Sequence, residues 1–131
     1  MARRPRSLRL ADYLQNIVDA VGRIRGYTAG LTQDDFLRSP LIQDAVIRNL
    51  EVIGEACRNV LRNHPEFVTA HGDVPWRSPY EMRNALTHGY FEIDFVWTWT
   101  TIQGDLLTFE AQIVALLMLL DQPSSPDGVG R

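Results

Sequence analysis

The apolar positions of this chain recur at helical spacing over most of its length. In the first such stretch they alternate in steps of four and three residues, which aligns them on one face of a helix. This pattern predicts a first helix over residues 8–26, with Ser7 as its N-cap. The apolar positions are Leu10, Leu14, Ile17, Val21 and Ile24.

A turn-rich segment follows this helix. Gly26 and Gly30 can take the left-handed conformation that ends a helix. Thr32 followed by Asp35 resembles a capping box, in which each residue bonds the backbone N–H of the other. The sequence therefore predicts one short helical turn that ends at Leu37.

A second apolar stripe begins after Ser39 and Pro40, an N-cap residue followed by proline at the first helical position. We expect this helix to cover residues 40–63 and to stop at His64, because the residue before a proline avoids the helical conformation. The stripe consists of Ile42, Val46, Leu50, Ile53, Cys57 and Val60.

The rest of the chain also favours helices. One short turn is expected over residues 66–69, and a helix of under three turns should start near Pro79 and end at Gly89. Asp94 should cap a long final helix over residues 95–120, which is apolar on all sides and is therefore expected to be central. No strand pattern is evident, so the predicted class is an all-α helical bundle with short connections.

Composition agrees with one globular domain, since 45% of the 131 residues are hydrophobic and 22% are charged. The single cysteine, Cys57, excludes an intramolecular disulfide and a thiolate zinc cluster, which fits a reducing compartment. The most apolar window, residues 102–120, is interrupted by Asp105 and Glu110. We therefore expect a cytoplasmic protein that does not span a membrane.

The charge is distributed unevenly along the chain. Residues 1–9 hold four of the thirteen arginines and no acid, so the remaining chain sets nine cations against sixteen anions. Such a body does not attract nucleic acid through a large field, and DNA is not an expected partner. RNA would have to be bound by a local arginine cluster or by the basic arm. The expected organisation is a basic arm (1–7), a helical domain (8–120) and a disordered tail (121–131).

Polar chemistry is concentrated in the segment "EMRNALTHGYFEID". At 100° per residue, Arg83 and Tyr90 lie about 20° apart on a helix, and Asn84 and His88 lie about 40° apart. If the helix ends before Tyr90, its hydroxyl can turn toward the space that His88 occupies. A polar site at a helix C-terminus would result, where the carbonyl dipole favours a protonated histidine.

On spacing alone, a structural interpretation of the same residues is the favoured one. Arg83 could pair with Glu81 or Glu92 on the surface, while His88 and Tyr90 serve as half-buried packing residues. Composition does not overturn this structural interpretation.

The order of the polar residues is more specific. An arginine, four residues of any kind, a histidine, one further residue and a tyrosine occur as Arg83, His88 and Tyr90. This order closely resembles the signature of the HEPN superfamily, and specifically of the HepT-like toxins. The similarity covers about residues 8–120. It includes "RNLEVIGEACRNV" (48–60), "VPW" (74–76) and "DFVWTWTTIQGDLLTFEAQI" (94–113).

The resemblance implies a HEPN-type bundle of about four to five helices and a metal-independent endoribonuclease without a cofactor. Histidine can transfer protons near neutral pH, and arginine can bind phosphate oxygens in two places. The resemblance therefore implies that His88 is the general acid/base, that Arg83 stabilises the phosphate, and that Asn84 has an orienting role. Because one histidine cannot easily perform both proton steps, a two-fold homodimer with both motifs in one cleft is expected.

The resemblance also implies a toxin–antitoxin system, with an MntA-type nucleotidyltransferase antitoxin as partner and RNA as substrate. Tyr90 would be the residue to which the antitoxin attaches AMP, and the added phosphate would block the cleft. The alternative is a non-catalytic HEPN binding module that only docks a nucleotidyltransferase.

Two further acids, Glu51 and Glu55, share a helical face. A di-metal site is not expected there, because no Glu-x-x-His occurs in the chain. Surface ion pairs with Arg48 and Arg58, respectively, explain these acids more simply.

Overall fold

The computed structural model describes residues 6–87 and 93–121, and all regular structure in these ranges is helical. The all-α prediction is thereby confirmed. The described residues form seven helices, more than the four to five expected, because two connections are helical and the final helix is divided. The helices are α1 (Arg6–Thr28), α2 (Gln33–Leu37), α3 (Pro40–Asn63), α4 (Pro65–Ala70), α5 (Arg77–Thr87), α6 (Phe95–Gln103) and α7 (Asp105–Asp121).

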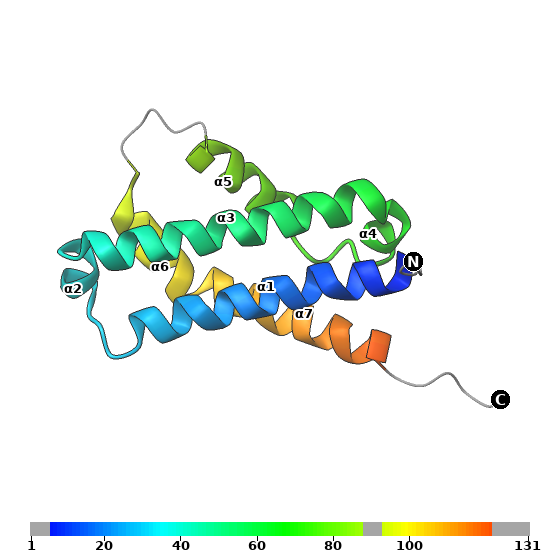
Figure 1. Ribbon diagram of the computed structural model, residues 1–131, viewed down its shortest axis with the longest axis horizontal. Coiled ribbons are helices and arrows are strands. Elements are labelled where there is room, and N and C mark those ends of the chain that lie inside the picture. Colours follow the sequence, from blue (N-terminus) through cyan, green and yellow to red (C-terminus); the bar gives the residue numbers. More distant parts are fainter. Residues whose placement is uncertain (1–5, 88–92, 122–131) are drawn as a thin grey trace, which may run out of the picture.

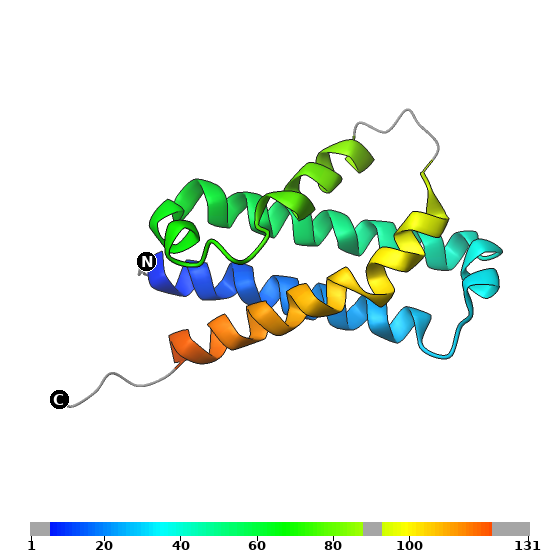
Figure 2. The same ribbon diagram turned by 180° about the vertical axis from the view of Figure 1, so that it is seen from behind.

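Helix α3 occupies the centre of the arrangement, with α1 along one side and α5 along the other (Figure 1). Helix α7 packs on α1, and α6 contacts α2. Seen from behind, α6 and α7 cross in front of α1 and α3 (Figure 2). The prediction that the final helix is central was therefore wrong. Its apolar surface is only partly covered, and the exposed side chains are Val96, Trp97, Leu107, Val114, Met118, Leu119 and Leu120.

Three helix starts were predicted correctly from their capping residues. Thr32 and Asp35 form the expected capping box, at 3.0 and 3.1 Å. The Ser39 side chain accepts a hydrogen bond from the N–H of Ile42, and Pro40 opens α3. Asp94 accepts from the N–H of Trp97 at the start of α6. Local hydrogen bonding thus sets these starts, because the caps satisfy N–H groups that have no partner within the helix.

Other predicted boundaries were displaced. Ser7 lies inside α1, which begins at Arg6, and Gly26 also lies inside α1. Gly30 is the glycine that ends this segment, with φ at +78°. Helix α5 begins at Arg77, ahead of Pro79.

The final apolar stretch is broken at Gly104, and α6 and α7 are bent by 41° with respect to each other. Glycine weakens a helix interior, and the bend lets α6 reach α2 while α7 lies on α1. There the ring of Phe36 packs 5.3 Å from that of Trp99 and 6.0 Å from that of Phe95. In the described ranges, no single helix is long and apolar enough to cross a membrane; only the bent α6–α7 pair reaches that length and composition.

The core also explains the cysteine. Cys57 is fully buried on α3, and burial raises the pKa of its thiol. A thiol that stays protonated is a poor nucleophile, so Cys57 acts as a packing residue, as its position on the apolar stripe predicted.

Candidate active site

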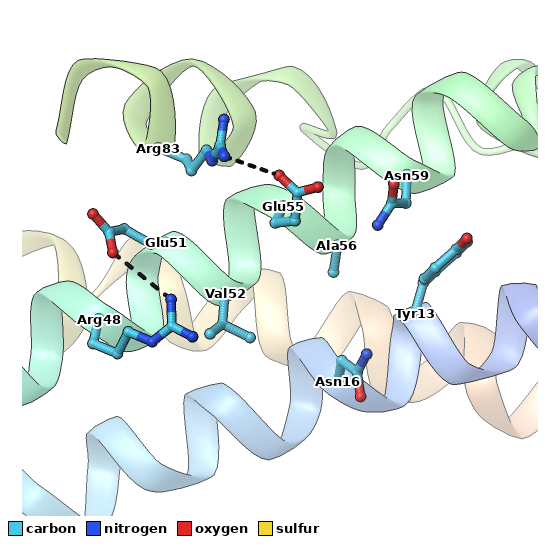
Figure 3. Close-up of a pocket in the computed structure, with 9 residues that line it drawn as sticks. All are labelled: Tyr13, Asn16, Arg48, Glu51, Val52, Glu55, Ala56, Asn59 and Arg83. Carbon is cyan, nitrogen blue, oxygen red and sulfur yellow. Dashed lines mark ion pairs between the residues drawn. The ribbon is translucent and has the colours of Figure 1, made fainter. Parts of the chain in front are cut away.

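A groove runs along α3 between α1 and α5 and has a volume of about 430 Å³ (Figure 3). Arg83 lies at its edge on the α5 side, and Arg48 approaches it from α3. Tyr13, Asn16 and Asn59 line another part of it. The groove therefore brings two arginines, each paired with a glutamate, together with uncharged polar side chains.

Gly54 determines how closely α5 approaches α3 beside this groove. A Cβ at Gly54 would overlap the Cβ of Arg83 and would lie 2.6 Å from the carbonyl oxygen of Pro79. Any larger side chain would have to push α5 away, because backbone atoms cannot give way cheaply. Gly54 thus permits the contact that seats Arg83 on α3.

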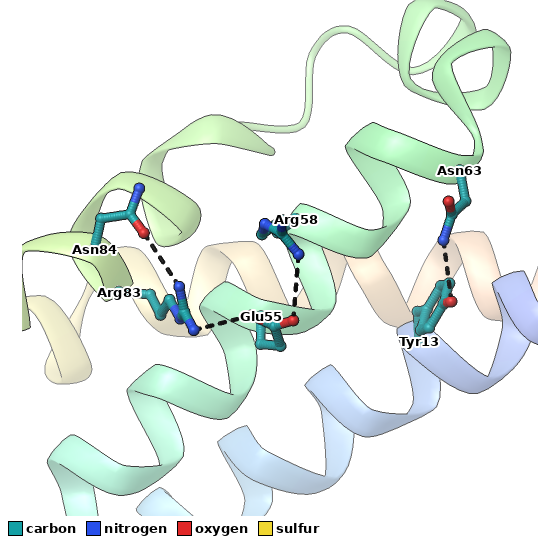
Figure 4. A network of polar contacts seen from close by, with 6 residues as sticks. All are labelled: Tyr13, Glu55, Arg58, Asn63, Arg83 and Asn84. Carbon is teal, nitrogen blue, oxygen red and sulfur yellow. Dashed lines mark hydrogen bonds and ion pairs between the residues drawn. The ribbon is translucent and has the colours of Figure 1, made fainter. Parts of the chain in front are cut away.

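Arg83 is held by two neighbours. Its Nη2 lies 3.2 Å from Oε1 of Glu55 on α3, and its Nη1 donates a hydrogen bond to Oδ1 of Asn84 at 3.2 Å (Figure 4). Among the described residues, the ion-pair partner of Arg83 is Glu55. The structural interpretation had instead supposed Glu81, which lies on the same helix as Arg83. Glu92, the other acid considered, lies outside the described residues.

The contacts of Arg83 with Glu55 and Asn84 do not use all the donors of its guanidinium. Glu55 Oε1 is buried, and its contact with Arg83 is an ion pair without hydrogen-bond geometry. A guanidinium carries five N–H donors, so donors remain that could bind phosphate oxygens.

Tyr80 joins the same network one turn before Asn84. The pKa of Tyr80 lies below its ordinary value, mainly because its side chain is hydrogen-bonded to Asn84, and the charges of Arg58 and Arg83 lower it further. Desolvation acts in the opposite direction. The environment of this half-buried phenol is therefore positive.

These side chains form a polar network across the contact between α3 and α5. Glu55 pairs with Arg58 at 3.6 Å and with Arg83 at 3.2 Å. The bond between Asn84 and Arg83 extends the network along α5. More than one polar contact therefore joins the side chains at this meeting point of α3 and α5.

The surface pairs predicted from spacing are present, since Glu55 pairs with Arg58 and Glu51 with Arg48 at 4.0 Å. The described residues contain no group of three side chains suited to hold a metal ion.

Sequence reasoning identified Arg83 and Asn84, and the structure places both at the contact of α5 with α3. His88 and Tyr90, the other predicted site residues, lie outside the described residues. Three residues of this contact were not assigned to the site: Gly54, Glu55 and Tyr80. Gly54 carried a signal, because a glycine inside an apolar helical stripe often marks close packing. Tyr80 stands three and four positions before the polar pair and so shares its helical face.

Comparison with known proteins identifies the family. Residues 17–116 match the model of the family described as "Ribonuclease HepT-like". No solved structure matches the chain.

Several curated proteins are similar to this chain. The "Probable ribonuclease HepT" of Thermococcus cleftensis is 36% identical over 80% of this chain and 93% of its own length. A "Putative RNase" of Caldanaerobacter subterraneus subsp. tengcongensis is 32% identical over 80% of this chain and 91% of its own length.

A third relative is longer. The "Gamma-glutamylcyclotransferase and putative RNase" of Methanocaldococcus jannaschii is 36% identical over 84% of this chain, which spans only 48% of that protein. The family match includes the whole segment from α3 through the arginine–histidine–tyrosine motif. The chain therefore belongs to the HepT-like ribonuclease family of the HEPN superfamily.

Proposed function

We propose that this protein is the toxin of a toxin–antitoxin pair, a metal-independent endoribonuclease that acts in the cytoplasm. The observation that carries the proposal is Arg83, the first residue of the family motif, at the edge of a polar groove on α3. The alignment with a "Probable ribonuclease HepT" over most of both chains supports the same chemistry.

In the proposed reaction, an RNA 2′-hydroxyl attacks the neighbouring phosphorus. The new bond joins the 2′-oxygen to phosphorus, and the bond from phosphorus to the 5′-oxygen breaks, which leaves a 2′,3′-cyclic phosphate. His88 takes the 2′-hydroxyl proton or returns one to the 5′-oxygen. Arg83 stabilises the negative charge that develops on the phosphate, and Asn84 orients its guanidinium through the 3.2 Å hydrogen bond.

Each of the two proton transfers needs a group that accepts or donates the proton, and one histidine cannot easily serve both at once. We therefore propose a two-fold homodimer whose two motifs share one cleft. The dimer would also bring two copies of Arg83 to the substrate and concentrate positive potential in an acidic protein.

Regulation in this proposal acts on Tyr90. A nucleotidyltransferase antitoxin transfers AMP to the Tyr90 hydroxyl and releases pyrophosphate from ATP. The attached phosphate would compete with RNA for Arg83 and would obstruct the cleft.

The proposal is tested with the purified chain and a labelled RNA in EDTA. We expect cleavage by the wild type and a loss of at least about 100-fold in His88→Ala and Arg83→Ala, because each removes a group that acts in the transition state. Arg77→Ala removes an exposed arginine from the same helix and should keep full activity. Wild-type RNA cleavage no faster than that of His88→Ala would refute the nuclease.

One observation favours the alternative, a binding module that only docks a nucleotidyltransferase: Arg83 is already engaged by Glu55 and Asn84. A module of this kind predicts that His88→Ala leaves every phenotype unchanged, including growth of cells that express the chain alone. Growth arrest by the wild type but not by His88→Ala would exclude it.

A further inference from the structure

We infer that the groove between α1 and α5 on α3 is a nucleoside subsite, which holds the RNA nucleotide next to the phosphate that Arg83 binds. This inference deepens the proposed function and rests on it. The groove reaches Arg83 and Glu55, so whatever occupies it lies directly beside the candidate phosphate site. Its volume of about 430 Å³ is within the usual range of small-molecule sites.

Two asparagine amides project from opposite walls of the groove, Asn16 from α1 and Asn59 from α3 (Figure 3). Each amide offers donors and an acceptor, the combination that base edges require. Neither side chain makes a hydrogen bond within the described part of the chain, whereas Asn49 and Asn63 are engaged with other protein groups. The groove therefore presents the amides that the fold itself does not use.

An aromatic ring stands at the same part of the groove. The hydroxyl of Tyr13 accepts a hydrogen bond from Asn63 at 3.2 Å (Figure 4). The rings of Tyr13 and His64 pack in a T-shaped arrangement with their centroids 6.2 Å apart. These two contacts hold the ring in place. A fixed ring beside base-reading amides is the usual arrangement for stacking an unpaired base of RNA.

The charges of the groove suit an RNA strand. Arg48 and Arg83 both line it, so one nucleoside with a phosphate on either side has a guanidinium available for each. Arg48 is 74% exposed and only 4.0 Å from Glu51, a weak pair that a phosphate can replace. The lining of the groove is formally neutral, because Glu51 and Glu55 balance the two arginines, in a chain whose net charge is −3.

A binding experiment tests the subsite without any cleavage. The full chain is titrated with each of the four nucleoside 5′-monophosphates, and the side-chain amide signals of Asn16 and Asn59 are followed by NMR. We expect these signals to shift with at least one nucleotide, and its affinity to fall about 5- to 50-fold in an Asn16→Ala/Asn59→Ala double variant. Gln103→Ala, which removes an exposed amide from α6, should bind as the wild type does. Asn16→Ala alone changes an exposed residue and serves if the double variant does not fold.

Cleavage assays then separate this inference from the proposed function. In a nuclease with this subsite, the double variant still cuts RNA, with a KM raised about 5- to 50-fold, kcat within about threefold and a changed base preference beside the cut. RNA cleavage by the wild type with unmoved amide signals would overturn the subsite and leave the nuclease standing. Shifted amide signals in a chain that cuts no RNA would support the subsite and refute the nuclease activity. Amide signals that move with protein concentration but not with nucleotide would assign the groove to a second copy and overturn the subsite.

Discussion

Two contacts in this molecule are built on opposite principles. Where α2 meets α6, Phe36 is fully buried between the rings of Phe95 and Trp99. Where α5 meets α3, a glycine allows the helices to touch, and the adjoining ion pair of Arg83 and Glu55 is 28% and 43% exposed. The first contact removes apolar surface from water, and the second mainly positions charge. We therefore expect changes at the first to affect stability, and changes at the second to affect RNA cleavage more than stability.

Phe36→Ala should have the largest effect on stability. Removal of a fully buried aromatic side chain costs about 3–5 kcal/mol, because contacts are lost and a cavity remains. Urea unfolding followed by circular dichroism measures this loss. Leu41→Ala is the control, since Leu41 is 78% exposed and its truncation should cost less than about 0.5 kcal/mol. Equal losses in the two variants would show that the rings around Phe36 do not form the core.

Gly54→Ala should have the next largest effect and should act mainly on activity. The added Cβ overlaps Arg83 and Pro79, so α5 has to shift; overpacking of this kind costs about 1–3 kcal/mol. Displacement of Arg83 by about 1 Å should lower kcat for RNA cleavage by about 10- to 100-fold. Activity and the free energy of unfolding are measured on the same preparation.

A matched glycine is available as the control. Gly22 also lies inside a helix, but a Cβ there would meet no atom within 4 Å. Gly22→Ala should therefore stabilise the protein by about 0.5–1 kcal/mol and leave cleavage unchanged. If Gly54→Ala behaves like Gly22→Ala, then Gly54 does not set the position of Arg83.

The difference between the two contacts also explains what the sequence could predict. Local patterns are enough for helix starts, because Thr32, Ser39 and Asp94 each act within three residues along the chain. They predicted the bounds of α3 correctly, since its apolar stripe lies between a clear start and a clear stop. The break at Gly104 was missed, because a strongly apolar stretch hides a single glycine whose effect depends on where α2 and α1 lie.

The candidate site was only partly predictable for the same reason. Arg83 and Asn84 were found as members of a local motif. Glu55 was assigned only to Arg58, its neighbour along the helix, because the contact with Arg83 depends on how α5 crosses α3. That crossing is set by a missing side chain at Gly54, and periodicity does not detect it.

Glu55→Gln should have a smaller effect than Gly54→Ala, and it should strengthen RNA binding. The pair with Arg83 is partly exposed, so its loss should cost less than about 1 kcal/mol of stability. Removal of one negative charge from the groove changes the interaction with a phosphate by about 1 kcal/mol at short range, so KM should fall about 2- to 10-fold at low salt. KM measured over a salt series checks this, since the gain should fade as salt rises.

Glu66→Gln supplies the control for this variant. Glu66 is an exposed acid in the first turn of α4 and does not line the groove. An equal decrease in KM in both variants would mean that overall charge, rather than Glu55 beside Arg83, governs RNA binding.

Asp35→Asn should have the smallest effect on stability, and this effect should depend on pH. The pKa of Asp35 is held below its ordinary value of 3.8, mainly by the hydrogen bond from the backbone N–H of Thr32. Because the folded pKa is the lower one, this carboxylate stabilises the protein above the unfolded pKa, and the contribution is lost as the pH falls through the folded value.

Asparagine keeps an oxygen that can accept the same hydrogen bond but carries no charge. The wild type should therefore have a slightly higher Tm than Asp35→Asn at neutral pH, and the two Tm values should converge below the folded pKa. The other carboxylates titrate in both proteins and cancel in the difference. A Tm difference that persists undiminished in acid would mean that the charge of Asp35 does not stabilise the start of α2.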